Sequence, residues 1–179
     1  MISARRVLDE LKRNHVTHVI GLPDNSSIRM FQLLAEDRDI RLVSVTREGE
    51  AFAIAAGLWI GGRNPLVLVQ NTGLFESGDG IRGTITRMRV PLVCLVTYRG
   101  YAKTASAPRR NGESVSDMTL LSDAHLDSAA LITEPTLRSW GIPYGFLHND
   151  EHIFRISEAF EIASRNEQPF ALLVTNDMT

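Results

Sequence analysis

The sequence is poor in the features that mark secreted and membrane-spanning proteins. It has a single cysteine, Cys94, so no intrachain disulfide can form, and the apolar run PLVCLV around it predicts a small buried core side chain. No run approaches the ~20 consecutive apolar residues that a bilayer-spanning helix needs. The first residues, MISARRVLDELKRNH, carry charges throughout and do not follow the pattern of a secretory signal. We therefore expect a cytoplasmic protein without a membrane span.

An excess of positive charge is also missing. The chain has 19 Lys and Arg residues against 21 Asp and Glu residues, a net charge of -2 at pH 7. It therefore lacks the long-range field that draws proteins to nucleic acids or anionic membranes, and small molecules and protein partners are the expected ligands. No Gly-x-Gly-x-x-Gly turn or Walker loop occurs, so a generic nucleotide binder ranks last among the interpretations.

What the sequence does contain is an alternation of apolar positions at helical spacing with short β-branched runs, along all 179 residues. This alternation is typical of a parallel sheet with helices on both faces. The predicted fold is therefore α/β, a single three-layer domain over residues 1–179 with a mostly parallel central sheet. The expected strands cover residues 16–20, 41–45, 66–70, 92–97, 144–148 and 170–175.

Between these strands the sequence predicts helices and one long polar segment. Helices are expected in the first 15 residues, after a cap at Ser26 or Ser27, over 48–61, over 75–88, and after a cap at Thr133 with Pro135 in the first turn. Residues 98–118 lack periodicity and exceed the ~12 to 15 residues at which structureless loops become unusual. We expect a functional or mobile loop there.

Ligands of open parallel sheets bind at the carboxyl ends of the strands, because helix amino termini and irregular loops gather there. Four segments of this kind occur here, and they read GLPDNSS, TREGE, QNTGLFES and TYRGYAK.

The stretch REGEAFAIAAGLWIGG begins a predicted helix of small residues with a carboxylate. The plainest interpretation is an ordinary first-turn acid that the helix dipole stabilises. However, Glu48 followed by Ala51, Ala55 and Gly57, and then by a strand ending in QNTG, resembles the pyrimidine-binding domain of thiamine-diphosphate enzymes. In that family the Glu at this distance before the glycine activates the cofactor. The resemblance assigns this role to Glu48, because Glu50 lies two residues too late.

The resemblance implies a specific chemistry for Glu48. A carboxyl group held against the ring nitrogen of the aminopyrimidine can exchange a proton with it, which promotes the imino form that activates the thiazolium ring. A setting poor in water strengthens such a hydrogen bond. The alanine-rich helix is suited to provide that setting.

The resemblance extends over nearly the whole chain and is closest to the sulfopyruvate decarboxylase alpha subunits and the matching half of the phosphonopyruvate decarboxylases. Those domains have Gly-x-Pro after the first strand, Gln-Asn-x-Gly after the third and Arg-Gly after the fourth. The same order occurs here in GLP at 21–23, QNTG at 70–73 and RG at 99–100.

Two residues of the first loop are candidate substrate contacts. In related decarboxylases the second residue after the loop proline faces the substrate, and here that residue is Asn25, with Asp24 beside it. Asn25 departs from the Asp of pyruvate-type decarboxylases, and a neutral amide can donate or accept hydrogen bonds but cannot act as an acid or base. Alternatively, Asp24, Asn25 and Ser26 only turn the chain and cap a helix.

The third and fourth segments supply the other candidates. Thr72 and Gly73 lie where the family's loop approaches the cofactor rings, and a glycine allows close approach of the backbone; an ordinary turn is the alternative. Arg99 ends the most apolar strand, where a buried guanidinium needs an anion. The resemblance implies a sulfonate, phosphonate or carboxylate of the substrate, and a structural ion pair is the alternative. Three further cations are expected to be solvated: Lys103, Arg109 and Arg110.

No metal site is expected in this chain. The GDG at 78–80 matches the start of the magnesium and diphosphate motif of thiamine enzymes, but nothing downstream completes it, so we do not expect Asp79 to bind a metal. The five histidines show no metal-site spacing. The resemblance implies that a beta subunit carrying the diphosphate-binding domain holds the magnesium, and that thiamine diphosphate is shared between the two chains.

The predicted function is that of a subunit of a thiamine-diphosphate-dependent decarboxylase, active only with its partner, on a short 2-oxoacid like sulfopyruvate or phosphonopyruvate. Two alternatives stay open. One is a carboligase subunit that uses the same cofactor. The other is a noncatalytic binding or regulatory module that has kept the fold.

Overall fold

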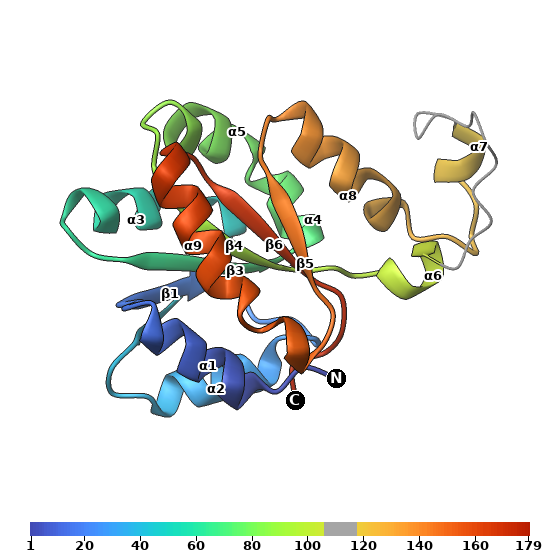
Figure 1. Ribbon diagram of the computed structural model, residues 1–179. Coiled ribbons are helices and arrows are strands. Elements are labelled where there is room, and N and C mark those ends of the chain that lie inside the picture. The colour runs from blue at the N-terminus through green and yellow to red at the C-terminus, as the bar shows by residue number, and fades with distance from the viewer. Residues whose placement is uncertain (106–117) are drawn as a thin grey trace.

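The centre of the computed structural model is one six-stranded sheet (Figure 1), and the structure describes residues 1–105 and 118–179. The strand order is β2-β1-β3-β4-β6-β5, and every neighbouring pair is parallel. The α/β prediction is confirmed, and the sheet that we expected to be mostly parallel is parallel throughout. The strands are β1 (His18–Gly21), β2 (Arg41–Ser44), β3 (Pro65–Gln70), β4 (Val93–Thr97), β5 (Tyr144–Leu147) and β6 (Phe170–Val174).

Three helices cover one face of the sheet: α1 (Ala4–Arg13), α2 (Ile28–Glu36) and α9 (Arg155–Asn166). The periodicity of α1 explains its position, because Val7, Leu8 and Leu11 point into the core and are at most 1% exposed. Ser3 caps this helix by accepting a hydrogen bond from the backbone N–H of Arg6. Figure 1 shows α1 and α2 together below the strands.

The opposite face is covered by α3 (Glu48–Ile60), α4 (Asn71–Glu76), α5 (Gly78–Gly80), a π-helical turn η1 (Ile81–Thr86) and α8 (Ser128–Ser139). Phe52 and Ala55 of α3 are buried with Leu74 of α4 against this face. The alanines of α3 allow the helix to lie close to β3, since a side chain of one carbon keeps the two backbones near each other.

Two helices differ from the predictions. The helix predicted over 75–88 begins earlier, at Asn71, and is divided among α4, α5 and η1. The helix predicted to begin at Thr133 begins at Ser128, because Asp127 caps it by accepting from the N–H groups of Ala129 and Ala130. Thr133 instead donates its hydroxyl to the carbonyl oxygen of Ala129 at 2.7 Å, inside the helix.

Part of the segment that we predicted to be a structureless loop is helical. Short helices α6 (Tyr101–Ala105) and α7 (Met118–Leu121) lie at the two ends of this segment. Lys103 is exposed, whereas the predictions for Arg109 and Arg110 fall outside the described residues. A last short helix, η2 (Asp150–His152), precedes α9.

The two ends of the chain lie side by side, as Figure 1 shows. Ile2 and Met178 form an isolated parallel bridge, and the N–H of Met178 donates to the carbonyl oxygen of Ser26 at 2.9 Å. The last residues therefore support the loop that follows β1. Among the described residues, no helix has the length and apolar character needed to cross a bilayer.

Candidate functional site

The parallel sheet brings the four predicted segments to one edge. Because all strands run in the same direction, the segments after β2, β1, β3 and β4 follow one another along the carboxyl ends in the spatial order of the strands. Glu48 begins α3 after β2, and Arg99 follows β4 at the other end of this row. The loop with Asp24 and the start of α4 with Gly73 lie between them.

Glu48 and Gly73 are in direct contact, although they belong to different elements. A Cβ atom added to Gly73 would lie 2.4 Å from Cγ and 2.5 Å from Oε1 of Glu48, so any larger residue at this position would occupy the space of the Glu48 side chain. Gly73 is buried and Glu48 is half-buried. The absence of a side chain at residue 73 therefore sets the position of the carboxylate.

Three carboxylates surround the first turn of α3, and two of them are engaged. Glu50 Oε2 accepts from the backbone N–H groups of Thr46 and Arg47, both at 3.3 Å. Glu76 Oε1 pairs with Arg47 Nη2 at 2.5 Å, and its Oε2 accepts from the N–H of Gly49 at 2.7 Å. The hydrogen bond from Arg47 and that from Gly49 lower the pKa of Glu76.

The third carboxylate, that of Glu48, makes no hydrogen bond or ion pair within residues 1–105 and 118–179. Its neighbours Glu50 and Glu76 take the local donors, namely the Arg47 side chain and the free N–H groups at the start of the helix. A half-buried acid with an unused hydrogen-bonding capacity is available to a ligand. Glu48 and Glu50 therefore differ in the hydrogen bonds of their carboxylates as well as in their spacing to Gly57.

Thr72 and Gly73 do not lie in a loop, contrary to our expectation. Both belong to the first turn of α4, with Gln70 as the preceding cap residue. Thr72 is exposed, and its hydroxyl donates to Gln70 Oε1 at 2.9 Å. A helix can begin directly at the strand end because Gln70 has an extended backbone, with φ -79° and ψ 159°.

Asp24 connects the loop after β1 to the end of β4. Its Oδ1 accepts from the N–H of Ser26 at 2.7 Å, and its Oδ2 accepts from the hydroxyls of Ser27 at 3.0 Å and Thr97 at 2.7 Å. These bonds use both carboxylate oxygens to shape the loop. Asn25 is exposed, and its amide makes no hydrogen bond in the described part of the chain.

Arg99 is not buried, so that part of our prediction is wrong. Its side chain is 61% exposed, and its Nε lies 3.2 Å from Asp127 Oδ2. The chain turns after β4 through Gly100, whose φ of +81° places it in the left-handed region, and Arg99 lies at the surface just before this turn. The guanidinium therefore has the structural ion pair that we considered as the alternative, while its Nη groups have no partner among the described residues.

The sequence did not mark Asn71 as an organising residue of the site. Its side chain is completely buried, and Nδ2 donates to the carbonyl oxygen of Arg99 at 3.1 Å and to Thr133 Oγ1 at 3.0 Å. Asn71 thereby joins the ends of β3 and β4 to α8. Its sequence signals are its place in the QNTG segment and its position after an apolar strand, and neither distinguishes a structural from a ligand-binding role.

The donor set of this edge fits the aminopyrimidine ring of thiamine diphosphate. Glu48 offers an unpaired carboxylate, and Gly73 leaves the space beside it free of a side chain. Asp79 of the GDG segment is 89% exposed and pairs with Arg82 at 2.6 Å. In residues 1–105 and 118–179, no three His, Cys, Asp or Glu side chains gather where they could hold a metal ion.

The chain is similar in sequence to a family of cofactor-binding domains and to several decarboxylases. Residues 1–125 match the family model described as thiamine pyrophosphate enzyme, N-terminal TPP binding domain. A phosphonopyruvate decarboxylase of Streptomyces hygroscopicus is 31% identical over 159 residues, which cover 82% of this chain and 40% of that protein. A sulfopyruvate decarboxylase subunit alpha of Methanococcus maripaludis is 25% identical over 175 residues, which cover 97% of this chain and 95% of that subunit. The chain thus spans less than half the length of the phosphonopyruvate decarboxylases that it matches.

A solved structure shares the fold. The crystal structure of benzoylformate decarboxylase from Polynucleobacter necessarius superposes with a TM-score of 0.66 and covers 98% of this chain and 30% of that one. The sequence identity is 18%, so this likeness concerns the architecture alone.

Proposed function

Because this chain belongs to the thiamine pyrophosphate enzymes, through their N-terminal TPP binding domain, we propose that residues 1–179 supply the pyrimidine-binding half of a thiamine-diphosphate-dependent 2-oxoacid decarboxylase. The observation that carries the proposal is the Glu48 carboxylate, which lies against Gly73 without a partner in the described part of the chain. The decarboxylase relatives support the reaction class.

In this proposal Glu48 holds the aminopyrimidine of the cofactor. The carboxyl group binds the ring nitrogen and moves a proton to and from that atom. Gly73 keeps the space beside the carboxylate free, and the Arg47 side chain and the N–H of Gly49 form their hydrogen bonds with Glu76 rather than with Glu48. When bound, the cofactor supplies the carbon nucleophile and the electron sink that decarboxylation of a 2-oxoacid requires.

Asn25 and Arg99 are the proposed substrate contacts of this chain. The substrate class is a short 2-oxoacid with a sulfonate or phosphonate group, as the names of the relatives suggest. The free Nη groups of Arg99 suit such an anion because a guanidinium can bind two of its oxygens at once. The exposed amide of Asn25 can donate to the substrate carboxylate or keto oxygen. Asp24 serves the loop rather than the substrate, since Ser26, Ser27 and Thr97 already occupy its oxygens.

We also propose a partner subunit. Three of the sulfopyruvate decarboxylase relatives are alpha subunits, and the match covers nearly all of one of them. A beta subunit with a diphosphate-binding domain would hold the magnesium and the diphosphate, and the active site would form between the two chains. This assignment agrees with Asp79, whose carboxylate is exposed and paired with Arg82.

The test compares Glu48→Gln with Glu50→Gln in the complex reconstituted with the partner. Both changes keep size and remove one negative charge, but only Glu48 has the proposed proton-transfer role. We expect Glu48→Gln to retain cofactor binding and lose turnover by about 10² to 10⁴-fold, the usual contribution of a general acid or base. Glu50→Gln should stay within about threefold of the wild type, since its amide oxygen can still cap the helix. Near-normal turnover of the Glu48 variant would contradict the proposal.

Two measurements distinguish the alternatives. Binding of thiamine diphosphate is measured by calorimetry for this chain alone and for the complex, and a half-site should bind well only in the complex. Absence of binding in both would favour the noncatalytic module. Release of carbon dioxide without a new carbon–carbon bond separates the decarboxylase from a carboligase.

A further inference from the structure

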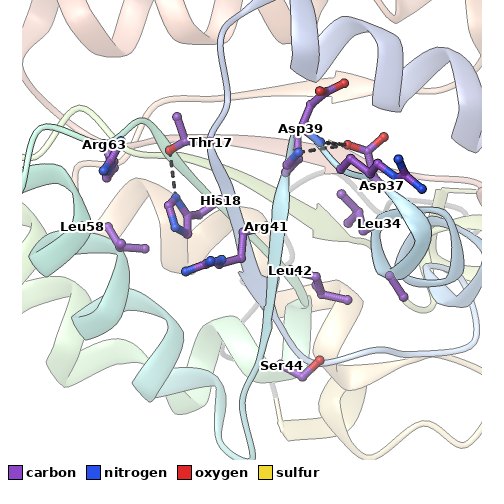
Figure 2. A pocket seen from close by; sticks show the side chains of 13 residues that line it. Thr17, His18, Leu34, Asp37, Asp39, Arg41, Leu42, Ser44, Leu58 and Arg63 are labelled. Atoms are coloured by element: carbon purple, nitrogen blue, oxygen red, sulfur yellow. Dashed lines mark hydrogen bonds between the residues drawn. The ribbon is translucent and has the colours of Figure 1, made fainter.

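A hollow lies along the edge strand β2, and its basic residues lie at the end of the sheet opposite to the candidate catalytic residues. Its volume is about 910 Å³, and Figure 2 shows the side chains that line it. His18, Arg41 and Arg63 come from the amino-terminal ends of β1 and β2 and from the residues just before β3. Glu48 and Asn25 instead follow the carboxyl ends, and the four residues of β1 alone separate the two edges by roughly 10 Å.

The inner side of this hollow is basic. Figure 2 shows the Arg41 side chain running beside the His18 ring, with Arg63 on the same side of β2. His18 Nδ1 is hydrogen-bonded to Thr17 Oγ1 at 2.9 Å, which leaves Nε2 for another partner. Desolvation by burial and the positive charges of Arg41 and Arg63 lower the pKa of His18, which agrees with the short separation of these groups.

The acids of the hollow do not neutralise these arginines. Asp37 and Asp39 also line it, but Lys12 Nζ lies 2.5 Å from Asp37 and 2.8 Å from Asp39. Asp37 Oδ1 accepts in addition from the N–H groups of Asp39 and Ile40, both at 2.9 Å. Figure 2 places both acids on the other side of β2 from His18.

A surplus of positive charge remains. Arg38, Arg41 and Arg63 have no ion pair within the described residues, and with Lys12 they give four positive charges against the two negative charges of the acids. The hollow, together with the Lys12 ammonium that pairs with its two acids, therefore carries a surplus of two positive charges when His18 is neutral, although the whole chain has a net charge of -2. A local field of this sign attracts small anions.

We propose that this hollow binds a small organic anion with at least two negative charges, such as a metabolite bearing a phosphate or several carboxylates. Arg41 and Arg63 would bind its oxygens, and His18 Nε2 would supply a further hydrogen bond. The volume is within the range of small-molecule sites. The half-buried side chains of Leu42 and Leu58 also line the hollow and can contact the rest of the ligand.

Charge also argues against a second copy of this chain on the open edge of β2. Leu42 and Ser44 direct their backbone groups away from β1, because Arg41 and Val45 use theirs to bind it. Pairing of two such edges would bring the arginines of both copies together, and like charges at a strand edge disfavour that contact. The ligand is therefore expected to be negatively charged and of a different kind.

The experiment is calorimetry of the full chain with inorganic pyrophosphate and, separately, with citrate. We expect a Kd of about 1 mM or lower for at least one of them, and a loss of at least about tenfold in the double variant Arg41→Gln/Arg63→Gln. The matched control is Arg87→Gln/Arg165→Gln, which removes two exposed arginines without ion pairs among the described residues and should leave the affinity unchanged. His18→Gln should weaken binding less than the arginine pair, and in the wild type the ligand should raise the pKa of His18 in an NMR titration.

Three outcomes would overturn the proposal. Failure of both anions to bind at about ten times the expected Kd is the first. Equal losses in the two double variants would indicate general charge screening. Tighter binding of a hexaglutamate peptide than of either small anion would indicate a protein segment as the ligand. Circular dichroism and thermal unfolding test whether each variant is folded. We expect all of the arginine variants to fold, because the four arginines are exposed.

Discussion

Replacement of Gly73 by Ala is the sharpest test of the Glu48 position. The added Cβ would lie 2.4 Å from Glu48 Cγ and 2.6 Å from Cδ, whereas carbon atoms in contact are about 3.8 Å apart. The Glu48 side chain must therefore move by about 1.4 Å or adopt another rotamer. It can do so, because no hydrogen bond or ion pair among the described residues holds it.

The effect on stability is expected to be small. An alanine in a helix is more favourable than a glycine by up to about 1 kcal/mol, and a new rotamer of Glu48 costs about 0.5 to 1.5 kcal/mol. The two contributions nearly cancel, so the free energy of unfolding should change by less than about 1 kcal/mol. For a chain of this size that corresponds to a change in Tm of no more than about 4 °C.

The effect on activity is expected to be large. A displacement of a catalytic group by about 1 Å reduces the rate by about 100-fold, because the proton must pass along a well-aligned hydrogen bond. Gly73→Ala should therefore reduce kcat of the reconstituted complex by at least this factor at nearly unchanged Tm. It is the combination of these two results that identifies Gly73 as the residue that sets the position of Glu48.

The assay measures release of carbon dioxide from sulfopyruvate or phosphonopyruvate by the complex, together with thermal unfolding of this chain. The control is Gly83→Ala, the same change at an exposed helical glycine where the new Cβ has nothing within 4 Å. Control and wild type should have the same turnover. A Gly73→Ala complex with wild-type kcat would refute the reasoning, and so would a loss of several kcal/mol in stability, which would show a rigid Glu48.

Further predictions concern the ends of β1 and β4 and the response to pH. Thr97→Val keeps the shape of the side chain but removes the 2.7 Å hydrogen bond to Asp24. The free energy of unfolding, measured in urea, should therefore fall by about 1 to 2 kcal/mol. An unchanged free energy would mean that Ser26 and Ser27 are sufficient to hold the loop. Arg99→Gln should raise KM for the anionic 2-oxoacid more than it lowers kcat, and an unchanged KM would exclude Arg99 from substrate binding. Desolvation by burial, His152 and Arg155 lower the pKa of His148, so the native state binds fewer protons than the unfolded state, and stability should decrease as the pH falls below about 6.5. His148→Gln should make that decrease smaller in urea unfolding measured at a series of pH values, and an identical slope would contradict the assignment.

Local patterns were sufficient for the main elements. The six expected strands agree with the observed strands to within two residues at each end, because each is a short apolar run between turn residues and needs no distant contact to be recognised. The start of α3 at Glu48 also agrees with the prediction. The predicted bounds were wrong for two helices, one in a glycine-rich segment and one with an internal proline. For the second helix the observed cap residue is Asp127, which lies before the Thr133 that we predicted as the cap.

The sequence by itself determined the α/β class, the edge of the sheet where the candidate residues gather, and Glu48 as the acid at the helix start. The first two conclusions follow from periodicity and from the common direction of parallel strands, and the choice of Glu48 over Glu50 follows from the family resemblance through its spacing to Gly57. Only the tertiary structure decided that Gly73 lies against Glu48, that Thr97 engages Asp24, that Arg99 is exposed and that an arginine-lined hollow lies beside β2. Each of these facts joins residues from separate elements, and their contacts depend on the packing of the helices and on strand order, which no local pattern encodes.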